Sequence, residues 1–402
     1  MPIIKFLTKP DNTFLNLSLY EGILSLIKYV ASIDFNENQL IMGNDTYRLF
    51  FKLVSSSKEW NTRIAQFRVR FVGNDINHRI PARILRALGI DVGDEKITSY
   101  DVFLNYLIKN YERLVDVSDD ELVFMLIGNT SIVGKYTKDL LPAPQLFKIE
   151  RYTSYTSLDT HVTYNQYGLK MTRDLTLISL IGLLSSYTVS AGGRGDFSYY
   201  FLFYSPDEIS MLLSSRDRDL IDNLYTLKNK LIRKFQQLIK TPLPEDILLL
   251  EVMIDLELIK SVRELELDQI SFLLYRIVPE GQTYKIYNTS PITIYSEPYY
   301  MSVLEKHVKN PDKFLEVLID ALKPENAILR AIYSLSWTEK MLEADQALMA
   351  TRYLYWFISS GDPNGLYGFI RELKNAYEKV KNEAPGRARF YSSIVSSLSK
   401  YF

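Results

Sequence analysis

Two stretches of the chain are strongly apolar at helical spacing and predict largely buried helices. Residues 12–33 contain the run LSLYEGILSLIKYVASI, and residues 172–187 have the sequence TRDLTLISLIGLLSSY. A helix with few polar positions lies inside a core rather than on a surface. We expect Gly22 to mark a point where the first of these helices packs closely against another element.

The last hundred residues show amphipathic segments of helical period, separated by short breaks at Pro or Gly. Short connections between such segments are typical of an antiparallel helical bundle. The pattern predicts helices at residues 300–309, 311–322, 325–337, 339–359, 366–383 and 387–401.

Between these regions the pattern mixes strands with helices. Residues 121–127 and 197–204 predict single strands, and residues 271–296 predict two strands around Pro279, Glu280 and Gly281. We also expect a hairpin over residues 39–54 that turns at Gly43, Asn44 and Asp45. A basic helical stretch, 207–239, is followed by an acidic one, 245–267, and we expect the two faces to meet.

Together these elements favour an α+β fold, with a mixed N-terminal and central region and a C-terminal antiparallel helical bundle. We predict three regions along the chain. They are a mixed region that contacts nucleic acid (1–205), helices plus a hairpin (206–298) and the helical bundle (299–402).

Positive charge is concentrated between Lys58 and Arg86, where seven basic residues face two acidic ones and the local net charge is +5. In residues 66–72, Phe67, Val69 and Phe71 alternate with polar positions that include two arginines, which predicts a strand with one apolar and one basic face. A turn and a helix up to Leu88 follow, and three arginines of that helix are spaced to share one face.

A basic patch in a nearly neutral chain favours contact with a polyanion, and the planar fork of arginine suits phosphates and guanine edges. We predict that the loop tip contacts base edges or a minor groove through Asn74, Asn77 and Arg79. We predict phosphate contacts for Arg68, Arg70, Arg83 and Arg86. The alternative is that these arginines only solvate the outside of an ordinary domain.

A second candidate contact lies further along the chain. Residues 128–170 are rich in Gly, Ser, Thr, Tyr and Lys and predict loops and short strands, in which lysines for backbone contacts alternate with tyrosines for base stacking. The residues we select are Asn129, Lys135 and Lys138, together with Arg194 in the glycine loop at 192–195. An irregular surface region and a plain hairpin turn are the alternatives.

Composition narrows the class of protein. The chain has 402 residues, of which 47% are hydrophobic and 24% charged, so it is long enough for two or three folded domains. A net charge of −1 argues against a protein that coats nucleic acid with its whole surface. The absence of cysteine excludes disulfides and thiol nucleophiles, and the absence of a long apolar run predicts no membrane partner and a cytoplasmic location.

The sequence shows no cluster of catalytic residues. His78, His161 and His307 lie far apart, and no phosphate-binding or serine-nucleophile motif is present, so we expect neither an enzyme nor a metal or other cofactor. Scattered carboxylates remain as candidates for a nuclease site only if folding brings them together. These are Asp94, Glu95, Asp255 and Glu257.

Two resemblances add to this interpretation. The string IPARILRALGIDVGDE resembles the core of swapped-hairpin transition-state regulators, which bind DNA, but it covers only about fifteen residues. Over most of the chain, the opening DNTFLNLSLYEGILSLIKY, the basic domain, the GLLSSY and FSYYFLFYSP segments around a glycine loop and the terminal bundle resemble the large subunit of archaeal type I-A CRISPR surveillance (Cascade) complexes.

The second resemblance implies a non-catalytic protein at the 5′ end of a guide RNA, beside repeated backbone subunits. Such a protein recognises a short motif in target duplex DNA, helps to separate the strands and recruits a helicase-nuclease effector. The alternatives are a sequence-specific DNA-binding regulator, as the first resemblance implies, and a structural protein of an archaeal mobile element.

Overall fold

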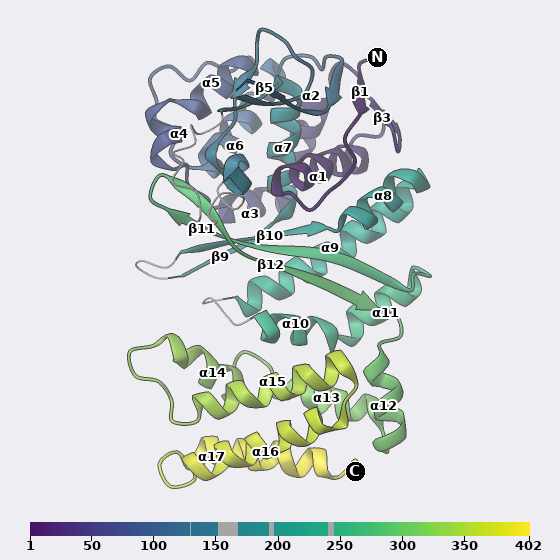
Figure 1. Ribbon diagram of the computed structural model, residues 1–402, viewed down its shortest axis with the longest axis vertical. Coiled ribbons are helices and arrows are strands. Elements are labelled where there is room, and N and C mark those ends of the chain that lie inside the picture. Colours follow the sequence, from purple (N-terminus) through teal and green to yellow (C-terminus); the bar gives the residue numbers. More distant parts are fainter. Residues whose placement is uncertain (129, 152–167, 193–196, 240–244) are drawn as a thin grey trace. The chain divides into compact units, whose positions relative to one another are not determined.

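The computed structural model describes residues 1–128, 130–151, 168–192, 197–239 and 245–402, and it confirms the α+β class (Figure 1). The chain forms two compact units. Unit 1 comprises Met1–Thr226 and Phe272–Pro291, and unit 2 comprises Leu227–Ser271 and Ile292–Phe402. This division differs from the three predicted regions, because helix α9 (Arg218–Leu238) and a long hairpin each contribute residues to both units.

Unit 1 holds three four-stranded sheets with helices packed around them. Its helices are α1 (Phe14–Tyr29), α2 (Thr46–Ser56), α3 (Lys58–Gln66), α4 (Gly73–Asn77), α5 (Ile80–Ala87), α6 (Tyr100–Lys109), α7 (Arg173–Ser186) and α8 (Pro206–Ser215), with the 3-10 turns η1 (Tyr111–Arg113) and η2 (Gln145–Arg151).

The first sheet has the order β2-β3-β1-β4, and only its β1–β4 pair is parallel. The second has the order β5-β6-β8-β7, with a parallel β6–β8 pair. The third has the order β12-β11-β10-β9. The strands are β1 (Ile3–Phe6), β2 (Asp34–Asn36), β3 (Gln39–Ile41), β4 (Asp120–Leu122), β5 (Phe124–Ile127), β6 (Thr130–Val133), β7 (Leu141–Pro142), β8 (Gly168–Met171), β9 (Tyr187–Ala191), β10 (Ser198–Tyr204), β11 (Gln269–Glu280) and β12 (Thr283–Tyr295).

Helices α1 and α7 form the centre of unit 1, and their prediction as buried helices is confirmed. They cross at two glycines. A Cβ atom on Gly22 would lie 2.0 Å from the backbone oxygen of Ile178, and one on Gly182 would lie 1.7 Å from the backbone oxygen of Ser18. Only glycine permits so close an approach of two backbones, which confirms the expectation for Gly22.

The predicted hairpin over residues 39–54 is wrong. Only Gln39–Ile41 forms a strand, and it pairs with β1 and β2, while residues 46–56 form the helix α2. The buried residues Tyr47, Phe50, Phe51 and Val54 of α2 follow the helical spacing i, i+3, i+4, i+7, and that period prevails over the turn signal at Gly43.

Unit 2 is helical apart from strand ends, and its C-terminal part confirms the predicted helices and short breaks. Proline occupies the first turn of α13, α16 and α17, where its missing N–H costs nothing, and the side chains of Asn310 and Asp362 cap α13 and α16. The helices are α10 (Glu245–Met253), α11 (Leu256–Glu264), α12 (Tyr299–His307), α13 (Pro311–Ala321), α14 (Ala327–Tyr333), α15 (Ala344–Ser360), α16 (Pro363–Val380) and α17 (Pro385–Ser399), with the 3-10 turn η3 (Ser334–Ser336).

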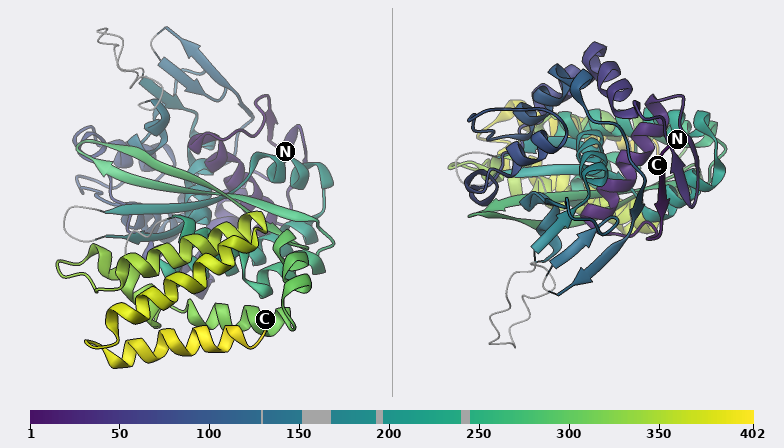
Figure 2. Two further views of the ribbon diagram at one scale, coloured as in Figure 1. Left: turned by 60° about the horizontal axis from the view of Figure 1, so that its bottom comes forward. Right: turned by 90° about the horizontal axis from the view of Figure 1, so that it is seen from above.

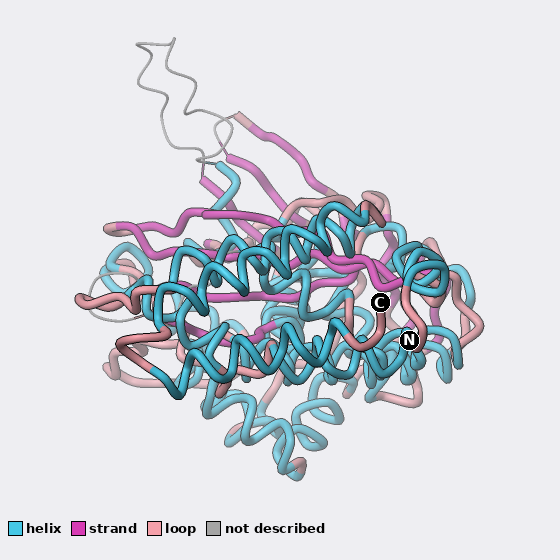
Figure 3. The backbone as a smooth tube through the Cα atoms, turned by 90° about the horizontal axis from the view of Figure 1, so that it is seen from below, coloured by secondary structure: helices cyan, strands magenta, loops and turns pink. Residues whose placement is uncertain are grey.

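Figure 2 shows α15 and α16 side by side in its left view, and Figure 3 draws the helices as cyan coils in a view from below. Gly361 and Asp362 alone separate α15 from α16, and Gly361 has a φ of 72°, the left-handed conformation that ends a helix. None of the helices in the described ranges is long and apolar enough to cross a membrane.

Candidate functional site

The predicted basic strand is an extended segment, residues 67–72, whose alternation is confirmed. Phe67, Val69 and Phe71 are buried, whereas Arg68 and Arg70 are exposed. The segment joins no sheet as a ladder strand, and its one bridge pairs Arg70 with Ser99. We therefore correct the prediction of a strand to an extended segment with one basic face.

The backbone of this segment is held on both sides. Phe71 N–H donates to Thr98 O at 2.9 Å, and Tyr100 N–H donates to Val69 O at 2.9 Å. The hydroxyl of Tyr187 donates to Gln66 O at 2.9 Å, and that of Tyr284 donates to Arg70 O. These bonds fix the backbone, so the two arginines project from a rigid support.

Aromatic packing secures the buried face of the segment. The ring centroids of Phe67 and Tyr187 lie 4.6 Å apart at 90°, and those of Phe71 and Tyr100 lie 4.1 Å apart in a stacked pair. Edge and offset arrangements of this kind are the favoured ones for aromatic rings. The apolar half of the alternation therefore determines which way the arginines point.

The predicted turn after this segment is wrong in its details, because residues 73–77 form the short helix α4. Asp75 is buried and accepts a hydrogen bond from Gln145 N–H at 2.9 Å, and burial raises the pKa of Asp75 to about 6. Of the predicted base-contacting residues, Asn74 is half-buried and Asn77 is exposed. The turn signals thus encode a helix anchored by one internal carboxyl.

Arg79, Arg83 and Arg86 are all exposed, but only Arg83 and Arg86 lie within α5, whereas the prediction placed all three in that helix. Arg79 lies between α4 and α5 with a φ of 51°, a left-handed conformation that is uncommon outside glycine. Its guanidinium pairs with Asp94 at 3.2 Å and donates to Gly93 O at 3.1 Å.

Arg86 reaches the same loop. It donates to Gly93 O at 2.8 Å, and its Nε lies 3.5 Å from Asp91 Oδ1. The N–H of Gly93 donates to Asp91, and this bond, together with Arg86, lowers the pKa of Asp91. Arg79 and Arg86 therefore brace the loop that follows α5, and their nucleic-acid contacts stay a prediction.

We use the name arginine face for three exposed arginines of unit 1, Arg68 and Arg70 on the extended segment and Arg83 on α5. All three are exposed, and no carboxylate of the described residues forms an ion pair with them. Arg63, which the charge count of this stretch included, belongs elsewhere. It is half-buried, donates to the backbone oxygens of Ser185 and Tyr187 and lies 5.6 Å from the ring centre of Trp60, so it supports the core.

The second predicted contact is described only in part. Lys135 and Lys138 are exposed on the segment after β6. Asn129 and Arg194 lie outside the described residues, as do the tyrosines between 152 and 167. Nothing in the described part of the chain joins the two lysines to the arginine face, so both contacts stay predictions.

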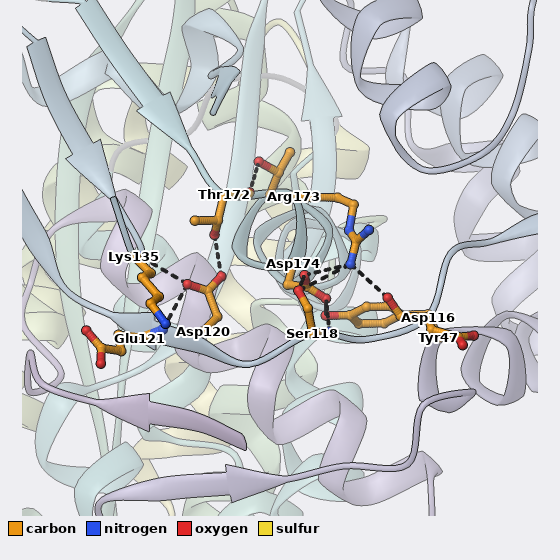
Figure 4. A network of polar contacts seen from close by, with 10 residues as sticks. Tyr47, Asp116, Ser118, Asp120, Glu121, Lys135, Thr172, Arg173 and Asp174 are labelled. Carbon is orange, nitrogen blue, oxygen red and sulfur yellow. Dashed lines mark hydrogen bonds and ion pairs between the residues drawn. The ribbon is translucent and has the colours of Figure 1, made fainter. Parts of the chain in front are cut away.

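A buried polar network that the sequence did not reveal holds the start of this lysine segment (Figure 4). Asp120 Oδ1 accepts hydrogen bonds from the N–H groups of Lys135 at 3.0 Å and Glu121 at 2.8 Å, and Asp120 Oδ2 accepts one from the hydroxyl of Thr172 at 2.5 Å. Burial raises the pKa of Asp120. Both oxygens of the Asp120 carboxyl accept hydrogen bonds from the protein, so we assign this side chain a structural role.

A second carboxyl lies beside it in the first turn of α7. Asp174 accepts hydrogen bonds from the hydroxyls of Tyr47 at 3.0 Å and Ser118 at 2.7 Å and from Arg173 at 3.2 Å (Figure 4). Burial, with Asp174 adjacent, raises the pKa of Tyr47 well above its usual value. The partners come from distant parts of the sequence, so no local motif signals this network.

The scattered carboxylates fall into separate local roles. Asp94 pairs with Arg79, while Asp255 caps α11 through its bonds to Glu257 N–H and Leu258 N–H. Within the described residues, no three His, Asp or Glu side chains are grouped so that they hold a metal ion. The described geometry of unit 1 therefore supplies exposed arginines, and Asp94 and Asp255 do not come together in one site.

No family model and no solved structure matches the chain. An uncharacterized protein of Archaeoglobus fulgidus is 32% identical to it over 405 aligned residues. The alignment covers 98% of this chain and 99% of that protein, so the two share their whole length. The chain therefore belongs to the same family as this Archaeoglobus fulgidus protein.

Proposed function

We propose that the protein is the non-catalytic large subunit of an RNA-guided DNA surveillance complex in antiviral defence, and that the arginine face contacts the target duplex. The observation that carries the proposal is the rigid support of exposed arginines in unit 1. Arg68 and Arg70 alternate with buried apolar residues on a fixed backbone, and Arg83 is exposed on the helix that follows α4.

This geometry suits phosphate contact. A guanidinium offers a fixed fork of donors, and a rigid backbone reduces the entropy lost when it docks on a phosphate. Arg79 and Arg86 order the neighbouring loop, and exposed Asn77 on α4 supplies an amide suited to a base edge. Phosphate contacts position a protein on the duplex, and contacts to base edges supply its specificity.

The place in a surveillance complex rests on the resemblance of the chain's layout to type I-A large subunits. In that setting the partners are a guide RNA, repeated backbone subunits and a helicase-nuclease effector, and target specificity comes mostly from base pairing with the guide. The protein then needs only a short motif and phosphate contacts, which agrees with a basic face on a chain of net charge −1.

Replacing Arg68, Arg70 and Arg83 together by Ala tests the contact. The variant chain is purified with the partners it retains, and its duplex DNA affinity is measured by fluorescence anisotropy between about 50 and 200 mM salt. We expect weaker binding and a shallower slope of log affinity against log salt. The slope should decrease by about 0.9 for each phosphate that the variant no longer neutralises, about 3 in all.

Arg330→Ala is the matched control, because Arg330 is an exposed helical arginine of unit 2. It should leave both affinity and slope near the wild-type values. Unchanged affinity and slope in the triple variant would remove the arginine face from the proposal, even if the protein still assembles with a guide RNA.

A further inference from the structure

Unit 2 contains a cavity of about 350 Å³ between α9, α10, α11 and the end of α13. This volume is within the range of small-molecule sites, which begins at roughly 300 Å³. The cavity lies wholly within unit 2 and is independent of the arginine face. Its walls combine apolar side chains with charged ones.

In the wall of the cavity, one oxygen of the Glu251 carboxyl has no hydrogen-bond partner among the described residues. Glu251 of α10 is 6% exposed, and its Oε1 has no hydrogen-bond partner in the described structure, whereas its Oε2 lies 3.7 Å from Lys234 Nζ. Lys234 forms its shorter ion pair with Asp255, with 2.7 Å between Nζ and Oδ2. A buried polar atom without a partner costs about 1–3 kcal/mol, which a ligand N–H would relieve.

The expectation that the basic and acidic helices meet is confirmed here, and burial raises the pKa of Glu251 to about 7. When the pKa of a carboxyl is raised this far, the neighbouring groups do not replace the hydration that its charged form has lost. This holds for Glu251 even though the ammonium group of Lys234 lies beside it. Perturbed pKa values cluster at functional sites, and ion-pair networks such as Lys234 with Asp255 also produce them.

The remaining lining has three chemical parts, of which the carboxylates Asp255 and Glu257 are one. Leu238, Leu258, Ile319 and Pro324 give apolar wall, which suits the flat face of a ring. Cationic side chains from α9 and from the segment after α13 form another part of the wall, and their charge suits a phosphate. These cations are Lys230, Arg233 and Lys323. Lys323 also pairs with Asp320 at 2.7 Å, and Lys230 donates to the hydroxyl of Ser261 at 3.1 Å.

We propose that this cavity binds a nucleotide, with the base between the apolar side chains, its N–H edge on Glu251 and its phosphate near Lys230 and Lys323. Carboxylates accept hydrogen bonds from amino groups of bases in the same way. A free mononucleotide and a single nucleotide of a longer strand share this chemistry. The experiment separates these two sources.

The test uses the full chain and isothermal titration calorimetry with the four ribonucleoside monophosphates, ribose 5-phosphate and a short single-stranded RNA. We expect at least one monophosphate or the RNA to bind, and ribose 5-phosphate to bind at least about tenfold more weakly. Binding of the RNA without any monophosphate assigns the site to a nucleotide within a strand.

Glu251→Gln should weaken that binding by about tenfold, because Lys234 favours the amide oxygen on its own side, and the NH2 group then replaces Oε1, where a base donor needs an acceptor. The double change Lys230→Ala and Lys323→Ala alters two exposed side chains and should weaken binding through the phosphate while the fold is retained. Glu264→Gln is the control, since Glu264 is an exposed carboxylate of α11 outside the cavity and should bind like wild type.

Circular dichroism melting of each variant separates loss of binding from loss of fold. The proposal is overturned if no nucleotide or RNA binds, if ribose 5-phosphate binds as well as the nucleotides, or if folded Glu251→Gln and the lysine double variant both bind like wild type. Changes in the arginine face should leave this binding unaltered, so the two proposals fail independently.

Discussion

Arg63 and Arg83 carry the same charge in the same basic stretch but have different surroundings. Arg63 is half-buried, and desolvation lowers its pKa, while the carbonyls of Ser185 and Tyr187 accept its hydrogen bonds. Arg83 faces solvent on α5. The acceptors of Arg63 lie more than a hundred residues away in sequence, so a local charge count does not separate the two arginines.

Asp75 provides a residue-scale prediction for the stability of unit 1. Its pKa rises from 3.8 to about 6 in the folded state, so the folded chain binds its proton more tightly than the unfolded chain. Asp75 therefore supports folding most below about pH 4, and this contribution is lost as pH rises to about 6. The pKa difference corresponds to at most about 3 kcal/mol.

Asp75→Asn removes the titration and keeps an oxygen that accepts the bond from Gln145 N–H. The difference in melting temperature between variant and wild type should favour the variant increasingly from pH 4 to pH 6 and then become constant. Melting curves at pH 4, 5, 6 and 7 measure this. A difference that does not change with pH would show that Asp75 is ionised at the same pH in both states.

At the scale of elements, the crossing of α1 and α7 is the most constrained contact in unit 1. Gly182→Ala should destabilise the protein by at least about 3 kcal/mol, because the new Cβ meets the backbone oxygen of Ser18 and the helices must separate. Urea unfolding followed by circular dichroism measures the decrease in stability.

Gly386→Ala is the control for that change. Gly386 lies in the first turn of α17, and a Cβ there would have no atom within 4 Å, so the substitution should be neutral or slightly stabilising. Equal effects of the two substitutions would mean that the close crossing is not the source of the destabilisation.

The elements that hydrophobic period predicts well are those with one dominant signal. The apolar run of α7 and the Pro and Gly breaks of the C-terminal bundle are examples. Residues 39–54 carried two signals, a turn at Gly43 and a helical period from Tyr47, and the period prevailed. Alternation correctly oriented Phe67 and Arg68, but whether an extended segment pairs into a sheet depends on a partner that alternation does not supply.

At the scale of the whole molecule, the candidate sites differ in how much the sequence reveals. The arginine face was predictable because exposure follows from local period. The bonds by which Arg79 and Arg86 hold the loop after α5 were not predictable from the sequence. They depend on the left-handed backbone conformations of Arg79 and Gly93. For the Glu251 cavity, the sequence predicted only that two helical stretches of opposite charge meet. The cavity itself was not predictable, because it arises from the way α9, α10, α11 and α13 pack together.

The most direct measurement of the central claim is affinity purification of the tagged chain from its native cells, with sequencing of the bound RNA and identification of the bound proteins. A surveillance subunit should bring down short repeat-derived guide RNAs and a backbone subunit present in several copies. Recovery of the chain alone, or of a dimer bound to a few genomic DNA sites without RNA, would contradict the account.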